Sequence, residues 1–490
     1  MRKKIVFWLL FAAIMSLSFK ISQDRSLSMR FVDEEDHITI ASFINKNLKL
    51  YQEIQSNHQP IVYYASATLQ KLIQPDNIFM LVRRHRQAMF FYGAFWSLLI
   101  AWRFRTVGLI FVMFFEFLKY YLFGNLWLME SFAVYPSVYL LGISLKIWLE
   151  NFQPKIPEWI FLGFSSFLII FNLVPLWPWL ATIWFLILIK VKQKIILPGL
   201  TLLIITIIFF NPTHSFKDWF IRTIYNNFVY AIPDLSPFKQ PTDYLKIIFF
   251  PFLAFFNFKS LQAQFIALFF TGYLIALIKK PKLIIIYPLL ALINNRVLSP
   301  SMVYYQGFHL LPWLGLLIFS FGYSLKTIKY RFLFIWVIWA GILMLNKNMP
   351  YFWKTNPTEE YYINYSYFDD LNWAIKTINS NSAKTRAAIF SNEILIQWNN
   401  GSFPATKQVV YYPWEKKIPD LKKDYDKVFN LTNPNLPEFI YGPTDKELAQ
   451  AKYKLLKRDG KETELLIRND IFQNISQEQW HILASRRFSP

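Results

Sequence analysis

Apolar segments recur along most of this chain, and they constrain its fold more strongly than any other feature. A helix needs about 20 largely apolar residues to cross a bilayer, and a scan at that scale finds about eleven candidates. Backbone groups inside a bilayer must bond to one another, which favours helices. The sequence therefore predicts a mainly α fold, with a polytopic helical membrane bundle over residues 1–345. The segments are residues 5–19, 88–102, 106–123, 132–148, 157–171, 174–189, 195–210, 263–278, 283–292, 308–323 and 332–345.

Composition supports a membrane protein and excludes several other classes. Of the 490 residues, 54% are hydrophobic, and the mean hydropathy is +0.26, which is too apolar for an ordinary soluble domain. The chain has no cysteine, so disulfides, thiolate metal sites and a thiol nucleophile are excluded. The formal charge is +21, but the basic residues stand in short groups between apolar segments. No nucleic-acid partner is expected.

These basic groups predict the orientation, because loops rich in Lys and Arg tend to face the cytoplasm. We expect a multi-pass protein of the cell (plasma) membrane with a cytoplasmic N-terminus and a retained first helix. The basic groups that would share the inner side are residues 1–4, 103–105, 190–194, 279–282 and 326–331. The expected outer parts are residues 20–87, the loops 211–246 and 294–307, and everything after 345, with 247–258 as an interfacial helix.

The first outer loop, residues 20–87, is unusually long. Apolar side chains recur at helical spacing between residues 38 and 51, which predicts an amphipathic helix lying on the membrane. Packing against the bundle is the alternative. Pro60 suits the first turn of a second helix.

Residues 346–490 change in character and suit a small extracytoplasmic α/β domain. A helix is expected over residues 367–379. Asp459 and Gly460 form a hairpin turn signal between two strands. The expected strands are residues 387–390, 408–412, 427–431, 453–457 and 464–467.

The outer loop carries the main functional motif. Asp33 and Glu34 begin a run of four acids that precedes His37, and His58 stands two residues before Pro60. Carboxylates kept at a membrane face are candidates for a functional site. An Asp-Glu pair followed by His-x-Pro, in a long loop after a first membrane helix, resembles the GT-C superfamily of polyprenyl-phosphate-sugar-dependent glycosyltransferases. The similarity is to the branch of protein O-mannosyltransferases and lipid A aminoarabinose transferases, with specific matches over about thirty positions.

The resemblance implies an inverting glycosyltransferase that moves a sugar from a polyprenyl-phosphate donor in the membrane lipid to an extracytoplasmic lipid, glycan or protein hydroxyl. It gives Asp33 the role of general base, or of its electrostatic helper, toward the acceptor hydroxyl. Glu34 would orient the acceptor or join Asp33 in binding Mg²⁺ or Mn²⁺, although metal dependence stays open. Alternatively, these acids cap the N-terminus of a helix.

Basic side chains in the same loop are candidates for contacts with the donor. His58 would donate to a phosphate or sugar oxygen, or hold the loop, and His37 is a further candidate. Arg83, Arg84 and Arg86 would bind the donor phosphate and stabilise the leaving group. The alternative for the arginines is contact with anionic lipid headgroups or helix capping.

Two later segments complete the predicted site. Glu130 stands at the outer ends of two membrane segments, as an acceptor-site or metal partner of Asp33, or else as a charge at a helix N-terminus. Arg296, Tyr304, Tyr305 and His309 precede a late apolar segment, and by family resemblance they would hold the lipid phosphate and sugar. Aromatic residues at this position also anchor helices at the membrane interface.

A non-catalytic function is the rival hypothesis: a transporter or flippase, or an assembly protein, for lipid-linked envelope glycans. A transporter would carry polar residues at mid-membrane and repeated broken helices. Few charged residues lie at mid-span, Glu116 and Lys119 being the main ones, and no internal repeat is evident. The chain has no Walker loop, dinucleotide-binding glycine motif or His-Glu-x-x-His, so nucleotide-driven pumping and zinc proteolysis have no support.

Overall fold

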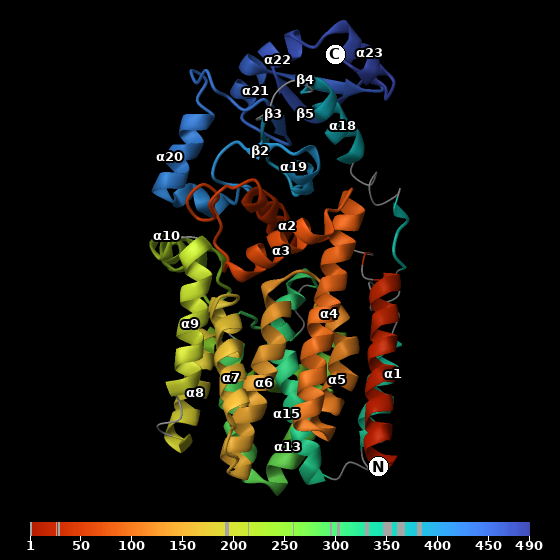
Figure 1. Ribbon diagram of the computed structural model, residues 1–490, viewed down its shortest axis with the longest axis vertical. Helices are drawn as coiled ribbons and strands as arrows, with labels where there is room; N and C mark the ends of the chain where they lie inside the picture. Colours follow the sequence, from red (N-terminus) through yellow and green to blue (C-terminus); the bar gives the residue numbers. More distant parts are fainter. Residues whose placement is uncertain are drawn as a thin grey trace.

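The structure is a computed structural model of the chain, and it describes residues 2–25, 27, 30–191, 196–213, 215–257, 259–294, 296–300, 304–328, 333–345, 355–359, 368–379 and 385–490. The molecule is elongated (Figure 1). The N-terminus lies at the foot of a helical body, and the C-terminus lies in an α/β region at the opposite end. Helices α2 (Val32–Asn45) and α3 (Ile61–Ile73) lie between these two parts.

The helical body confirms the helical prediction, because every predicted apolar segment lies at least partly in a helix. Five helical stretches of the described residues are long and apolar enough to cross a membrane: Lys4–Arg25, Met129–Glu150, Val174–Val191, Leu261–Lys279 and Gln306–Lys326. The helices of the body are α1 (Arg2–Arg25), α4 (Ile78–Phe104), α5 (Thr106–Leu118), α6 (Met129–Glu150), α7 (Ile156–Ile170), α8 (Trp177–Val191), α9 (Ile196–Thr213), α13 (Leu261–Lys279), α14 (Ile286–Ile293), α15 (Leu311–Ile328) and α16 (Leu333–Met344).

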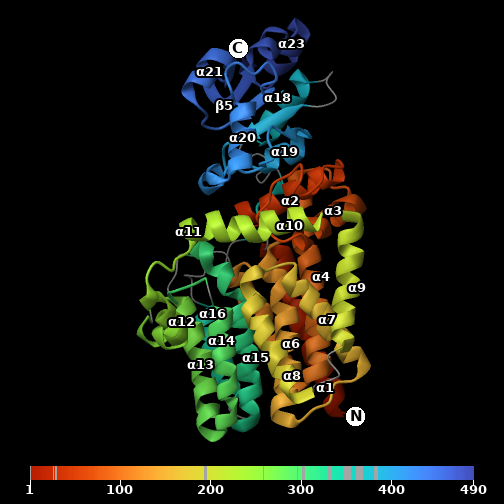
Figure 2. The same ribbon diagram turned by 90° about the vertical axis from the view of Figure 1, so that its left-hand side faces the viewer.

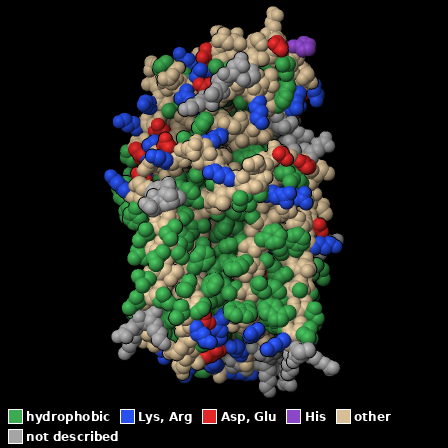
Figure 3. Space-filling view, in the orientation of Figure 1, with side chains coloured by type: hydrophobic (Ala, Val, Ile, Leu, Met, Phe, Trp, Pro, Cys, Tyr) green, Lys and Arg blue, Asp and Glu red, His purple; other side chains and the backbone are tan. Residues whose placement is uncertain are grey.

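The surface of the helical body has the pattern of a multi-pass membrane protein. In Figure 3 a broad band of hydrophobic side chains covers it, and Lys and Arg side chains gather at its foot. Charged side chains return on the outer region at the other end of the band. An apolar belt of this kind would be unstable in water and is typical of contact with lipid.

A buried polar cluster links α4, α5 and α6 inside this body. Lys119 Nζ lies 2.6 Å from Glu116 Oε2, and the Ser97 and Tyr135 hydroxyls each donate to Glu116 Oε1 over 2.8 Å. Burial of a lone charge would be costly, but here opposite charges and hydroxyl donors satisfy one another. The cluster therefore links the helices that carry it.

The outer loop folds differently from the prediction. Residues Glu34 to Phe43 of α2 are all buried, so the prediction of a helix lying on the membrane is wrong. Ile40 and Phe43 belong to the buried cluster of the helical body, as the alternative of packing against the bundle predicts. Helix α19 (Leu395–Asn400) of the C-terminal region packs against α2, which explains the burial. The predicted second helix is confirmed as α3, and Pro60 stands immediately before it.

A crosswise helix replaces the predicted loop 211–246. α10 (Phe216–Phe220), two π-helical turns (Ile221–Tyr225 and Asn227–Ala231) and α11 (Ile232–Leu235) follow one another in the chain and lie across the helical body in Figure 2. The predicted interfacial helix corresponds to α12 (Pro241–Leu253) and the short η6 (Ala254–Phe256). Many large apolar side chains of these elements are exposed, as expected at a membrane surface: Phe216, Phe220, Tyr225, Phe228, Leu235, Tyr244, Phe249 and Phe256.

The C-terminal region is a mixed α/β structure with a six-stranded sheet in the order β2-β1-β3-β5-β4-β6. β1 pairs in parallel with β2 and β3, and the other pairs are antiparallel. The strands are β1 (Arg386–Ile389), β2 (Phe403–Pro404), β3 (Phe439–Tyr441), β4 (Tyr453–Arg458), β5 (Lys461–Arg468) and β6 (Phe488–Ser489). The helices are α18 (Phe368–Ile378), α19, η10 (Pro413–Lys417), α20 (Pro419–Val428), α21 (Lys446–Lys452), α22 (Asn469–Gln473) and α23 (Gln477–Ala484).

Local sequence signals explain which strands were predicted. The β4–β5 hairpin is confirmed, and Asp459 and Gly460 have φ of 53° and 73°, as a type I′ turn requires. The predicted strand 408–412 is wrong because that segment is irregular, and 427–431 is wrong because it begins with the end of α20. β2, β3 and β6 have at most three residues each, too few for a periodic pattern.

The C-terminal region has one buried cluster of its own and shares a second one with the helical body and α2. Ile38 of α2 and Leu81 of α4 belong to the same buried cluster as Ile389 and Phe439 of the sheet. The predicted boundary near residue 345 therefore separates stretches of chain that share apolar contacts.

Close packing of α4 against α5 gives a first prediction. A Cβ on Gly108 would lie 2.3 Å from the Ile100 carbonyl oxygen, whereas a Cβ on Gly199 would have no atom within 4 Å. Because the first clash involves backbone, Gly108→Ala should destabilise the protein by about 1–3 kcal/mol or more. The apparent Tm in detergent should fall for this variant and stay unchanged for the matched control Gly199→Ala. Equal Tm values would contradict the α4–α5 packing.

Candidate functional site

The four consecutive acids lie at the start of α2, and the helix points their side chains in different directions. Successive residues on a helix point about 100° apart, so four consecutive acids face four directions. Asp33, Glu34 and Glu35 stand in the first turn, and Asp36 follows. Each of the four carboxylates has different surroundings.

Glu34 faces into the protein and pairs with Arg86 of α4. Both side chains are fully buried, with Arg86 Nη2 2.5 Å and Nε 3.1 Å from Glu34 Oε2. The backbone N–H of Trp127 donates to Glu34 Oε1 over 2.9 Å. These donors occupy the carboxylate, which differs from the predicted contact of Glu34 with an acceptor or a cation. They also occupy the guanidinium that was expected to bind phosphate.

Glu35 is held by Arg30, whose Nε and Nη2 lie 2.8 and 2.7 Å from its two oxygens. Arg30 Nη1 also donates to Glu393 of the C-terminal region over 3.2 Å. This pair therefore fastens the start of α2 to the outer region.

Asp33 differs from its neighbours in the run. Its side chain is half-buried, and no ion pair joins it to a basic residue in the part of the chain that the structure describes. Burial and the nearby charge of Glu130 raise its pKa to about 6, although Arg296 acts in the opposite direction. Its carboxylate is thus poised to exchange a proton near neutral pH, as a general base requires.

Glu130 is the centre of the second part of the site. It stands in the first turn of α6 and is buried. Arg296 Nη1 lies 2.8 Å and His309 Nδ1 3.0 Å from the same Glu130 oxygen. The structure thus brings together four residues that were predicted from separate segments: Asp33, Glu130, Arg296 and His309.

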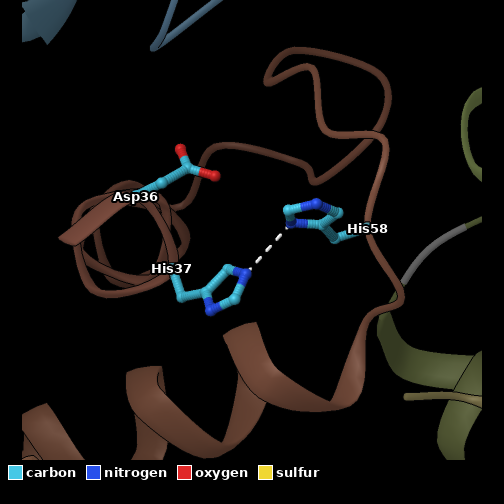
Figure 4. Close-up of side chains that lie close together, drawn as sticks. All are labelled: Asp36, His37 and His58. Atoms are coloured by element: carbon cyan, nitrogen blue, oxygen red, sulfur yellow. Dashed lines mark hydrogen bonds between the residues drawn. The ribbon is translucent and has the colours of Figure 1, made fainter. Parts of the chain in front are cut away.

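Two histidines form a hydrogen-bonded chain beside this group (Figure 4). His37 Nδ1 lies 3.0 Å from the Trp127 carbonyl oxygen, and His37 Nε2 lies 3.0 Å from His58 Nδ1. A carbonyl only accepts, so His37 Nδ1 carries a proton, and in the neutral pair His58 Nδ1 donates to His37 Nε2. Burial lowers the pKa of His37 to about 4 and that of His58 to about 3, so both rings are neutral at pH 7.

Asp36 and Glu415 are site residues that the sequence prediction missed. Asp36 is buried, and burial together with the charges of Asp33 and Glu415 raises its pKa well above the usual range. Burial also raises the pKa of Glu415, in η10, to about 7, and Gln408 donates to it over 2.8 Å. No local motif surrounds Glu415, so no sequence signal could have placed it beside α2.

Of the remaining predicted residues, two make contacts away from the Glu130 group, and two have side chains in the part of the chain that the structure does not describe. Arg83 stacks over Phe79 with 5.9 Å between its Cζ and the ring centroid, and Arg84 donates to Gln87 over 2.9 Å. Both contacts are local to α4. Tyr304 and Tyr305 begin η8 (Tyr304–Leu310), and their side chains lie outside the described part.

A small, mostly apolar pocket of about 10 Å³ lies between α5, α13 and the start of α15. Leu118, Leu122, Phe265 and Gln262 are among its lining residues, and so is Leu310, the residue after His309 in the chain.

No protein-family model matches this chain, and no curated protein matches it either.

The Glu34–Arg86 pair gives a stability prediction. Glu34→Leu would leave a buried arginine without its counter-ion and should cost about 3–5 kcal/mol. The double variant Glu34→Leu with Arg86→Met removes both charges and should recover most of that loss. The measurement is the apparent Tm of both single variants and the double variant in detergent. A double variant less stable than both single variants would contradict the ion pair.

Proposed function

We propose that this protein is an inverting membrane glycosyltransferase that uses a polyprenyl-phosphate-linked sugar. The observation that carries the proposal is Asp33, the one acid of the run with a half-buried carboxylate and a pKa of about 6, beside Glu130 and Arg296. A carboxylate of this kind suits removal of a proton from a poorly nucleophilic hydroxyl.

The reaction would be a single displacement. Asp33 accepts the proton of the acceptor hydroxyl while that oxygen forms a bond to the anomeric carbon. The bond from that carbon to the phosphate oxygen breaks on the opposite face, and the phosphate leaves with the electron pair, so the configuration inverts. Glu130 carries negative charge close to the sugar carbon, where a transition state with cationic character is stabilised.

The donor side of the site would use Arg296 and His309. Arg296 is a third exposed and pairs with Glu130 through one nitrogen, so other guanidinium N–H groups remain to bind a phosphate. Leu118, Phe265 and Leu310, which line the small pocket, would offer apolar contacts to the first part of an isoprenoid chain. Apolar side chains and a cationic guanidinium suit the two halves of a lipid phosphate.

The membrane arrangement belongs to the same proposal. The eleven apolar segments of the sequence would all belong to the membrane domain, with the shorter helices completing the five long ones. Lys and Arg gather at the foot of the helical body (Figure 3), which favours a cytoplasmic foot and N-terminus. The site and the C-terminal region would then face the extracytoplasmic side of the plasma membrane.

Substitution of the base tests the proposal. In purified protein with polyprenyl-phosphate sugar donors, Asp33→Asn should lower kcat by about 10²–10⁴-fold, because it removes the proton acceptor and keeps the shape. The matched control is Asp76→Asn, an exposed acid between α3 and α4, which should retain full activity. Transfer by Asp33→Asn at the parent rate would refute the assignment.

The pH profile gives an independent check. The charged groups that act on Asp33 or interact with it are Glu130 of α6, Arg296, Asp36 of α2 and Tyr412 of the C-terminal region. A raised pKa of about 6 means that the carboxylate form exists above that pH and is lost below it. We expect kcat/KM to rise with pH up to about 6 and to level off above it. The residual activity of Asp33→Asn should lack this inflection.

A further inference from the structure

Three side chains on one side of the acidic turn have no role in the proposed transfer reaction. Asp36 and His37 stand on α2, and His58 stands in the segment that leads into α3. One ligand atom from each of the three lies within 4.8 Å of the other two. We propose that Asp36, His37 and His58 form a binding site for a divalent transition-metal ion of the Zn²⁺ type.

The spacing of the two imidazoles fits a shared ion. His37 Nε2 and His58 Nδ1 are 3.0 Å apart. Two nitrogens that bind one tetrahedral zinc at about 2.0–2.1 Å lie about 3.3 Å apart, so the rings need to separate by only about 0.3 Å. In Figure 4 the two rings approach each other through these nitrogens, and the Asp36 carboxylate points toward the same space from the neighbouring position on α2. An ion would replace the N–H···N hydrogen bond that joins the rings.

The surroundings orient both histidines as ligands. His37 Nδ1–H donates to the Trp127 carbonyl over 3.0 Å, which directs the lone pair of Nε2 toward His58. Most metal-binding histidines donate such a hydrogen bond from the ring nitrogen that does not bind the metal. The backbone of His58 is fixed on both sides, because its N–H donates to Ser56 Oγ over 3.1 Å and its carbonyl accepts from the Tyr51 hydroxyl over 2.8 Å.

The charge balance also favours a cation. Asp36 is only 4% exposed, and none of the described side chains forms an ion pair or a hydrogen bond with its carboxylate. A buried carboxylate without a partner is costly. The carboxyl group of Glu415 is close enough to act electrostatically on Asp36. A divalent ion bound to Asp36 would give its carboxylate an opposite charge.

The ligand types select the class of metal. Two imidazoles and one carboxylate are the set that zinc and related divalent transition metals prefer, whereas Mg²⁺ prefers oxygen ligands in octahedral geometry. The chain has no cysteine, so no thiolate competes for the ion. The site differs from the predicted Asp33–Glu34 metal pair, because Glu34 is bonded to Arg86.

Metal binding is measured on the full chain in detergent, with any polyhistidine tag removed and the protein treated with a chelator. Zn²⁺ is then titrated by calorimetry, and metal content is measured after desalting. We expect about one tightly bound ion per chain. Asp36→Asn and His58→Gln should each weaken binding at least about 100-fold, since even changes that only disturb the orientation of ligands cost 10–100-fold.

Matched controls separate this site from its neighbours. Asp33→Asn makes the same chemical change one helical turn away, and His309→Gln changes another half-buried histidine. Both should bind Zn²⁺ within about twofold of the parent. The proposal is overturned if the parent binds no Zn²⁺, if Mg²⁺ binds as tightly as Zn²⁺, or if the controls lose the ion while Asp36→Asn and His58→Gln retain it.

A spectroscopic readout covers the case in which a ligand variant does not fold. X-ray absorption of the Zn²⁺-loaded parent should show two imidazole ligands, and a spectrum with fewer than two imidazoles overturns the proposal. These measurements use neither donor nor acceptor. Failure of the metal site and failure of the transferase proposal are therefore distinguishable.

Discussion

The buried ion pair between Glu34 and Arg86 holds α2 against the helical body. It joins α2 to α4, and the N–H of Trp127 adds the segment before α6 to the same carboxylate. Trp127 also accepts from His37 through its carbonyl and donates to Val62 through its indole N–H. One residue thus bonds to two separate helices, α2 and α3. This arrangement helps to fix the direction of the first turn of α2 and so to hold Asp33 near Glu130.

The C-terminal region also stabilises the candidate site. It covers α2 with α19, contributes Glu415 beside Asp36, and shares a buried core with α2 and α4. Lys46 Nζ adds a bond of 2.6 Å to the Gly401 carbonyl. The outer region is therefore part of the walls around the acidic turn, and its removal would expose carboxylates whose pKa values depend on burial.

The sequence predicted most of the helical body, because apolar segments of membrane length leave few other structures. Pro60 and the Asp459–Gly460 turn were also predicted, since local chemistry determines both. The burial of α2 was not predicted. The helix that covers it, α19, lies more than 340 residues later in the chain, and such tertiary contacts override local patterns. The crosswise helix was missed for a related reason: its polar and apolar residues alternate without the continuous run that marks a membrane segment.

The same reasoning applies to the site. Glu130, Arg296 and His309 come from segments that the predicted topology put on the same side of the membrane. The three residues could therefore be predicted to belong to one site. Glu34 was different, since only the position of Arg86 on the facing helix shows that its carboxylate is occupied. Asp36 could be separated from Asp33 only once the helix phase of α2 was known.

The ion pairs of the crosswise helix α10–α11 have a consequence for the C-terminal region. Arg222 on this helix pairs with Asp420, and Asp234 pairs with Lys417 at 2.6 Å, both in the C-terminal region. Its exposed row of Phe216, Phe220 and Phe228 suits the boundary between headgroups and acyl chains. At that boundary, the two ion pairs would connect the C-terminal region to the membrane surface through this helix.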